Sequence, residues 1–239
     1  MLRVLEVVSC SSTNDEIKAA AQRVQEDLIL WTANQTGGRG KRARKWESKA
    51  GHGLALSAYL HSPRLEPFTG YTLVAALAVV HLLEELGLTP KVKWPNDILI
   101  GGRKICGILC EAQMDHRGAC SLIIGIGINV KQREGDFPVD LRDKATSLEI
   151  EESSNIRIDK IAEKLAISLQ REIERAERRG IPMELLKEYN GLLQKQILIE
   201  TGGKEVTGIV TGIDPANRLI LQTDQGPQWI VSGEIIKMD

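Results

Sequence analysis

The segment from Thr69 to Leu86 is apolar on nearly every side, and this constrains the fold more than any other feature of the chain. A surface helix needs a polar face, so a helix without one predicts a position inside the core, ending at Gly87. Its most apolar run, Leu73 to Leu83, is shorter than the roughly 20 residues that cross a bilayer, and His81 interrupts it. We therefore expect the chain to pack other elements around this segment, with no membrane partner.

The composition is that of an ordinary globular protein. Of 239 residues, 42% are hydrophobic and 26% are charged, and 31 basic against 32 acidic residues give a net charge of -1. This balance argues against a general nucleic-acid coat or a polybasic membrane anchor, so any basic patch must be local. The N-terminus has no basic segment followed by an apolar core, so we expect no signal peptide. The four cysteines, none in a C-x-x-C pair, predict free thiols in the cytoplasm, with Cys106 and Cys110 as a less favoured metal-ligand pair.

Two patterns divide the chain near residue 190. Up to that point, short apolar or β-branched runs alternate with amphipathic stretches such as Asp159 to Arg179, which predicts a sheet with helices. From about Gly191, five short strand-like runs follow one another, separated by turns rich in Gly, Asp and Asn. That pattern predicts a small β-barrel of about 45 to 50 residues, docked on the larger domain because it is marginal alone. The predicted domains are residues 1–190 and 191–239, and the predicted fold class is α+β with a mixed or antiparallel sheet.

The strongest local anomaly is the segment from Gly37 to Trp46, which reads GGRGKRARKW. Five of the seven residues from Arg39 to Lys45 are cationic, and glycines precede and interleave them. Glycines let a ligand approach the backbone, and Arg and Lys add charge-assisted hydrogen bonds to anions. Neither a Walker A loop nor a dinucleotide fingerprint fits, because Arg42 stands where the first needs Ser or Thr and Ala43 where the second needs Gly. The residues favour anion binding over a nucleic-acid patch or a plain basic surface.

Two further clusters carry unusual residues. The segment Lys93 to Asp97 (KWPND) is followed, past a Gly-Gly turn, by Arg103-Lys104. Polar groups in such a turn can hold a ligand or Mg²⁺, although a cation there is often only an exposed edge charge. The segment Gly125 to Asn129 (GIGIN) alternates glycines inside an apolar strand, which indicates a bulge or a place where something packs on bare backbone. A glycine-rich core strand is an equal alternative.

In their order along the chain, these segments resemble the biotin protein ligases, over nearly the whole length from Val4. The resemblance rests on Ser12-Thr13-Asn14, Gln35 through Trp46, Lys93 to Asp97, Arg103-Lys104 with Gly107-Ile108-Leu109, Gly125 to Asn129, and Ser232-Gly233-Glu234. It implies a class II synthetase-like catalytic domain followed by an SH3-like barrel. It also implies that the carboxylate of biotin attacks the α-phosphorus of MgATP, giving biotinyl-5′-adenylate and pyrophosphate. A lysine of a carboxylase's biotin carboxyl carrier domain then takes the biotin and releases AMP. A homodimer is implied as well.

The resemblance assigns roles by position. The implied catalytic residues are Lys104, Arg39 and Lys41. The implied biotin-binding residues are Ser12, Thr13, Asn14, Gln35, Gly38, Arg39, Gly40, Lys41, Lys104, Gly107, Leu109 and Gly125. The implied ATP- or adenylate-binding residues are Arg42, Arg44, Trp46, Asn96, Asp97, Lys104 and Asn129. Mg²⁺ would arrive on ATP, and no protein ligand is assigned to it.

Each of these roles has a plainer alternative. Ser12 and Thr13 can simply cap the first helix, Trp46 can be a core aromatic, and Lys104 can be a bystander. Asn96 and Asp97 can be only a turn. Two other activities also compete. A lipoate ligase or octanoyl transferase on a related fold would lack the glycine–arginine loop, and an RNA-binding module would need aromatic residues beside that loop, which the sequence does not supply.

The chain also departs from the family pattern. Lys41 stands where the family often has a second arginine, and lysine keeps the charge but loses the bidentate fork. We therefore expect catalysis to survive and retention of the adenylate to weaken. Ala43 replaces a frequent glycine. The catalytic motifs begin at Ser12, which leaves no room for the winged-helix domain that begins some relatives, so we expect no DNA partner.

Overall fold

A computed structural model describes the chain except for residues 1, 25, 42–43, 115–119, 153–155 and 239. The larger of its two sheets has seven strands in the order β1-β2-β3-β7-β6-β5-β4. These strands are β1 (Arg3–Glu6), β2 (Leu28–Thr32), β3 (Gly53–Leu60), β4 (Lys91–Lys93), β5 (Asp97–Ile100), β6 (Arg103–Met114) and β7 (Cys120–Asn129). Only the β1–β2 pair is parallel among the described pairs of this sheet, and the others are antiparallel. The prediction of a mixed sheet is therefore confirmed.

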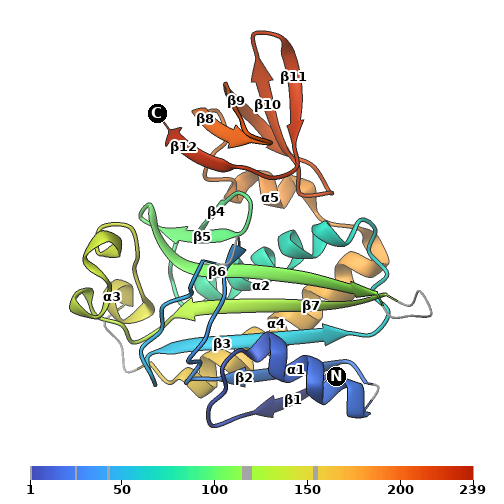
Figure 1. The fold of residues 1–239 in the computed structure, drawn as a ribbon, viewed down its shortest axis with the longest axis vertical. Coiled ribbons are helices and arrows are strands. Elements are labelled where there is room, and N and C mark those ends of the chain that lie inside the picture. Colours follow the sequence, from blue (N-terminus) through green and yellow to red (C-terminus); the bar gives the residue numbers. More distant parts are fainter. Residues whose placement is uncertain (1, 25, 42–43, 115–119, 153–155, 239) are drawn as a thin grey trace.

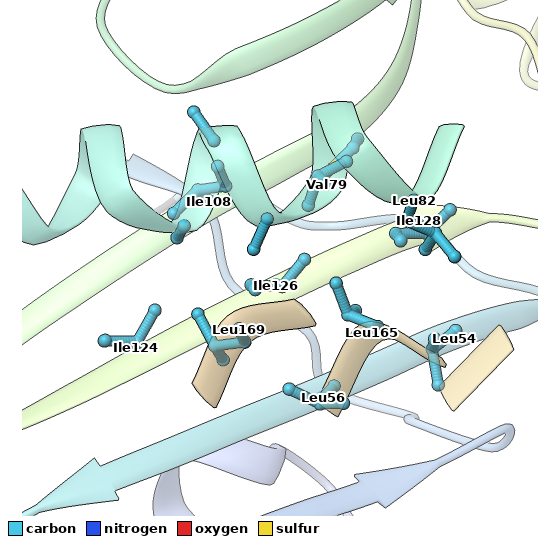
Figure 2. Packing of buried hydrophobic residues seen from close by; sticks show 14 of the residues in the cluster. Leu54, Leu56, Val79, Leu82, Ile108, Ile124, Ile126, Ile128, Leu165 and Leu169 are labelled. Atoms are coloured by element: carbon cyan, nitrogen blue, oxygen red, sulfur yellow. The ribbon is translucent and has the colours of Figure 1, made fainter. Parts of the chain in front are cut away.

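The apolar segment forms the central helix, as predicted. Helix α2 (Tyr71–Glu85) ends just before Gly87, whose φ of +78° suits glycine. By length and composition the segment Phe68–Glu85 could cross a membrane, but 72% of it is buried inside the structure. Figure 2 shows Val79 and Leu82 of α2 facing the sheet beside Leu165 and Leu169 of α4. The helix is therefore a core element. The other α-helices of the described residues are α1 (Thr13–Val24), α3 (Leu148–Glu152), α4 (Ile158–Arg179) and α5 (Met183–Tyr189), and short 3₁₀ helices are η2 (Phe68–Gly70), η3 (Glu134–Asp136) and η4 (Val139–Leu141).

The two faces of the larger sheet are covered differently. One face, with Ile124, Ile126 and Ile128 of β7, packs against α2 and α4 (Figure 2). Because side chains alternate along a strand, Ile123 points to the opposite face, where it packs with Ile17 of α1. Helix α1 covers the part of this face formed by β2, β3 and the adjoining part of β7 (Figure 1). The glycines of β6 and β7 lie on the same face beyond the helix.

The five predicted C-terminal strands are present and form an antiparallel sheet in the order β11-β10-β9-β8-β12. They are β8 (Gln196–Thr201), β9 (Lys204–Ile213), β10 (Leu219–Thr223), β11 (Gly226–Ile230) and β12 (Glu234–Met238). This sheet sits at one end of the larger domain (Figure 1). Trp94, only 2% exposed, packs into its core, and its indole Nε1 donates a hydrogen bond to the Asn217 carbonyl oxygen at 2.8 Å. The tryptophan of the KWPND segment thus anchors the two sheets to each other.

Candidate active site

A cavity of about 720 Å³ opens on the face of the larger sheet that α2 and α4 leave free, and it extends to the C-terminal sheet. It brings together most of the residues singled out in the sequence. Those that line it are Ser12, Thr13, Asn14, Gln35, Arg39, Gly40, Lys41, Arg44, Trp46, Asn96, Asp97, Lys104, Gly107, Leu109, Gly125 and Asn129. Gly38 lies just behind the wall, against Gln35 and Trp46. Arg42 lies outside the described residues. The segments separated in sequence therefore meet in one place.

The glycine–arginine segment folds back on itself beside this cavity. The Gly40 N–H donates to the Arg44 carbonyl oxygen at 2.7 Å, and the Trp46 N–H donates to the Gly38 carbonyl oxygen at 2.9 Å. Arg39 makes two hydrogen bonds to Asp15 in the first turn of α1, at 2.6 and 2.7 Å. On its other side, Arg44 pairs with Glu234 at the start of β12. The segment is thus held between α1 and the C-terminal sheet.

Ion pairing and partial burial shift the pKa values of ionisable groups in and around this segment. The hydrogen bond from Arg39 lowers the pKa of Asp15 below its ordinary value. Lys41 is exposed as a whole, but partial desolvation of its ammonium group at the cavity lowers its pKa. Because Arg39 and Arg44 are paired with carboxylates, Lys41 is the cation of the segment whose surroundings most oppose its charge among the described residues.

The indole of Trp46 packs directly on the backbone of β6 and β7, at glycines that have no side chain to block it. Gly107 of β6 and Gly127 of β7 are directly paired in the sheet. A Cβ atom added at Gly127 would stand 2.7 Å from Trp46 Cε2, and one at Gly107 would stand 2.9 Å from Trp46 Cζ3. Something does pack on bare backbone here, and Trp46 lines the cavity rather than sitting in the core. Gly125 is covered in the same way by the side chain of Asn14, whose Oδ1 is the atom nearest to an added Cβ.

Lys104 points into the cavity from the start of β6. Its Nζ atom lies 2.6 Å from Asp97 Oδ1 and 5.4 Å from the centre of the Trp46 ring. Its backbone is held on both sides, because its N–H donates to the Lys144 carbonyl oxygen at 2.7 Å and its carbonyl accepts from the Thr146 N–H at 2.9 Å. This geometry argues against a bystander at an exposed edge.

Two amides near Lys104 hold the walls together. Asn96 Nδ2 donates to the Ile108 carbonyl oxygen at 2.7 Å, which ties the KWPND turn to β6. Asn129 Nδ2 donates to the Thr146 carbonyl oxygen at 2.9 Å, and its Oδ1 accepts from Gln132 Nε2 at 3.3 Å. Both side chains border the cavity with their amide groups already engaged, whereas Asp97 faces Lys104.

The start of α1 both begins the helix and lines the cavity. The Ser12 carbonyl oxygen accepts the Glu16 N–H at 3.0 Å, as expected where a helix starts. The Thr13 N–H donates to Gln35 Oε1 at 2.8 Å. Helix start and cavity wall are thus two functions of the same residues, and neither reading excludes the other.

Further residues at the cavity had no role assigned from the sequence. They include Phe137, Leu141, Lys144 and Ala145, as well as Lys93 and the segment 232–235, which belong in part to the motifs quoted above. Ser57 and Glu111 lie behind the wall and also had no assigned role. Ser57 carried a usable signal, since it is a polar residue in the otherwise apolar strand GLALSAYL. Phe137 and Leu141 carried none, because they lie in short turns without a motif.

The cysteines and the described acidic residues form no cluster of metal ligands. In the part of the chain that the structure describes, no three or more His, Cys, Asp or Glu side chains lie close enough to hold an ion. Cys106 is 0% exposed and packs in the main core, and Cys110 packs against that core. Burial raises the pKa of the Cys110 thiol to about 11. All four cysteines are free.

Comparison with known proteins shows the family to which the chain belongs. The profile of the biotin/lipoate A/B protein ligase family matches residues 4–129, and that of the biotin protein ligase C terminal domain matches residues 192–238. The chain is 36% identical over 222 residues to a bifunctional ligase/repressor of Bacillus subtilis, covering 90% of this chain and 68% of that protein. It is 28% identical over 236 residues to a biotin–[acetyl-CoA-carboxylase] ligase of Paracoccus denitrificans, covering 94% of this chain and 96% of the relative.

Solved structures extend the likeness to the whole fold. The biotin protein ligase of Aquifex aeolicus, in complex with biotin and ATP, superposes with a TM-score of 0.84 at 26% identity. The match covers 100% of this chain and 99% of that one. The chain belongs to the biotin/lipoate A/B protein ligase family, and within it to the biotin protein ligases.

Proposed function

We propose that this chain attaches biotin to a lysine of the biotin carboxyl carrier domain of acetyl-CoA carboxylase, using ATP and passing through biotinyl-5′-adenylate. The observation that carries the proposal is the single cavity in which the glycine–arginine segment, Lys104 and the residues at the start of α1 meet. Its support from relatives is the full-length similarity to an enzyme that binds biotin and ATP.

In the first step, a carboxylate oxygen of biotin attacks the α-phosphorus of ATP, and the bond to pyrophosphate breaks. Both reactants are anions, so the site must offset their repulsion and the charge that develops at phosphorus. Lys104 is suited to this, because its Nζ already projects into the cavity beside Asp97. Arg39 and Lys41, which also line the cavity, would supply further positive charge.

Holding the adenylate requires that water be kept out, because a mixed anhydride hydrolyses. The glycine–arginine segment is placed to cover it, anchored through Arg39 to α1 and through Arg44 to the C-terminal sheet. In the second step, the ε-amino group of the carrier lysine attacks the anhydride carbonyl carbon. The new bond is an amide, AMP leaves, and the amine loses a proton.

The roles of the remaining predicted residues follow from their places. Ser12, Thr13 and Gln35 would bind the ureido ring of biotin, and Gly107, Leu109 and Gly125 would form its wall. Trp46 and Asn129 would border the nucleotide. The described acidic residues form no cluster for a resident metal, so we propose that Mg²⁺ arrives on ATP, where it shields the phosphate charge.

We further propose that residues 1–190 carry out the catalysis and that residues 191–239 close the cavity through the segment 232–235. The enzyme would work in the cytoplasm as a homodimer.

The test is pyrophosphate release from MgATP with biotin, lipoate or octanoate offered separately. We expect release with biotin alone. Release with lipoate would keep the adenylation chemistry and overturn the substrate. No release with any of the three acids would refute the proposed activity and favour a binding module.

A further inference from the structure

A chain of hydrogen-bonded side chains runs behind the cavity wall from Glu111 on β6 to Gln35. We propose that Glu111, without touching biotin, sets the direction of every hydrogen bond in this chain and so makes the Thr13 hydroxyl an acceptor for a ureido N–H. The inference rests on the proposed function, since it concerns how the same site recognises biotin. It makes Glu111 a positioning residue for substrate specificity.

The first link fixes the amide of Asn14. Asn14 Nδ2 lies 2.6 Å from Glu111 Oε2, and a carboxylate can only accept, so the amide nitrogen must face Glu111. The amide oxygen then faces Ser57, whose hydroxyl lies 2.6 Å away. Asn14 is 6% exposed, and its amide group packs against Gly125, which limits its movement as well.

The second link fixes the hydroxyl of Ser57, which is 0% exposed. An amide oxygen cannot donate, so the single hydroxyl proton of Ser57 goes to Asn14 Oδ1. The Ser57 and Thr13 hydroxyl oxygens are 2.7 Å apart, so the proton between them must come from Thr13. The longer approach of Thr13 Oγ1 to Gln35 Oε1, 3.2 Å, competes for the same proton and is the weaker of the two.

At the cavity, this arrangement makes Thr13 Oγ1 a hydrogen-bond acceptor and Gln35 Nε2 a donor. With its proton directed to Ser57, Thr13 Oγ1 keeps its lone pairs for a ligand. Gln35, which also lines the cavity, accepts the Thr13 N–H through Oε1 at 2.8 Å, so Nε2 is the end of its amide that can donate to a ligand. A cyclic urea offers N–H donors next to a carbonyl acceptor, and this pair complements it. The dithiolane of lipoate offers neither group, so the same polarity disfavours it.

Replacing Glu111 by Gln keeps the shape and removes the constraint. A glutamine amide can accept or donate, so Asn14 is free to turn over and present Nδ2 to Ser57. Ser57 would then donate to Thr13, occupying one lone pair of Thr13 and turning its proton toward the ligand. The site would lose part of its complementarity to the ureido group while its packing stays the same.

The test is calorimetric titration of the full chain with biotin and with desthiobiotin, which keeps the ureido ring. We expect Glu111→Gln to raise the Kd for both ligands by about fivefold, the loss of one neutral hydrogen bond. Ser57→Ala, which cuts the chain between Asn14 and Thr13, should have a similar effect. The double variant should bind no more weakly than the weaker single variant, because Glu111 acts only through Ser57. Glu163→Gln, at an exposed pair with Lys160 on α4, is the matched control and should leave the Kd unchanged.

Each other result counts against the inference. An unchanged biotin Kd in Glu111→Gln, or effects of Glu111→Gln and Ser57→Ala that simply add, would overturn it. A wild-type chain that binds biotin but forms no adenylate would sink the proposed function, while the Kd values would still decide the role of Glu111. A wild-type chain that does not bind biotin would end both.

Discussion

The packing of Trp46 on the bare backbone of β7 predicts the effect of Gly127→Ala on activity, and its magnitude can be estimated from the structure. In Gly127→Ala, the new methyl carbon would stand 2.7 Å from Trp46 Cε2, 2.9 Å from Cζ2 and 3.0 Å from Nε1. Ordinary carbon contacts begin near about 3.5 Å, so the indole must move outward by about 0.8 Å. The indole is rigid, and the backbone N–H of Trp46 donates a hydrogen bond to the Gly38 carbonyl oxygen. A displacement of the indole is therefore transmitted to the glycine–arginine segment.

Overpacking of this kind costs about 1–3 kcal/mol. If this free energy destabilises the position of the glycine–arginine segment over the cavity, kcat/KM for biotin falls about tenfold for each 1.4 kcal/mol. We therefore expect a reduction of roughly tenfold or more in pyrophosphate release at low biotin concentration, with an unfolding midpoint close to that of the wild type. The assay is steady-state pyrophosphate release, followed by thermal unfolding of the same samples.

Gly212→Ala in β9 is the matched control. A Cβ added at Gly212 would meet only Ile220 Cδ1, at 3.8 Å, which is an ordinary contact. This variant should keep wild-type kinetics. If Gly127→Ala were as active as Gly212→Ala, the reasoning that Trp46 needs the bare backbone of β7 would be refuted.

Three further outcomes follow from contacts around the cavity. Arg44→Glu places like charges at the contact with Glu234 and should raise the KM for ATP about threefold, and adding Glu234→Arg should restore the wild-type KM. Because this ion pair is exposed, a much larger increase in KM would contradict the expectation. Because desolvation lowers the pKa of Lys41, its charge is lost at a lower pH than that of a free lysine. The kcat/KM for ATP should therefore fall as pH rises through that pKa. In Lys41→Arg the side chain stays charged, so the fall should move to higher pH. Identical pH profiles of the wild type and Lys41→Arg would exclude Lys41 as the group that titrates. Trp94→Phe loses the hydrogen bond to the Asn217 carbonyl and should lower the unfolding free energy by about 1–2 kcal/mol in urea titrations, whereas an unchanged midpoint would show that this bond does not hold the sheets together.

The sequence predicted those features that depend on a local pattern. A helix without a polar face had to be buried, and α2 is. Five short runs with turn residues between them form the C-terminal sheet. Alternating glycines in an apolar strand indicated close packing on the backbone, and Asn14 and Trp46 lie on them. In each case the physical cause lies within a few neighbouring residues.

The sequence could not predict pairings between distant residues. Arg44 and Glu234 are 190 positions apart, and nothing in either segment identifies the other as its partner. Asn96 and Asn129 were assigned to the nucleotide by position, and the sequence could not predict that their Nδ2 atoms donate to backbone carbonyl groups that only the folded sheet brings near. The link from Glu111 to Asn14 spans 97 positions and depends on the register of β6 against β7. Such contacts are products of topology rather than of local pattern.

The most direct test of the central claim is detection of biotinyl-5′-adenylate by mass spectrometry after mixing the enzyme with biotin and MgATP. We compare the wild type with Lys104→Ala, and with Lys204→Ala at the start of β9 as a control lysine outside the cavity. The account predicts the adenylate in the wild type and in Lys204→Ala, and a rate lower by about a hundredfold or more in Lys104→Ala, because a cation at the reacting oxygens is removed. Adenylate formed by Lys104→Ala at the wild-type rate would contradict it.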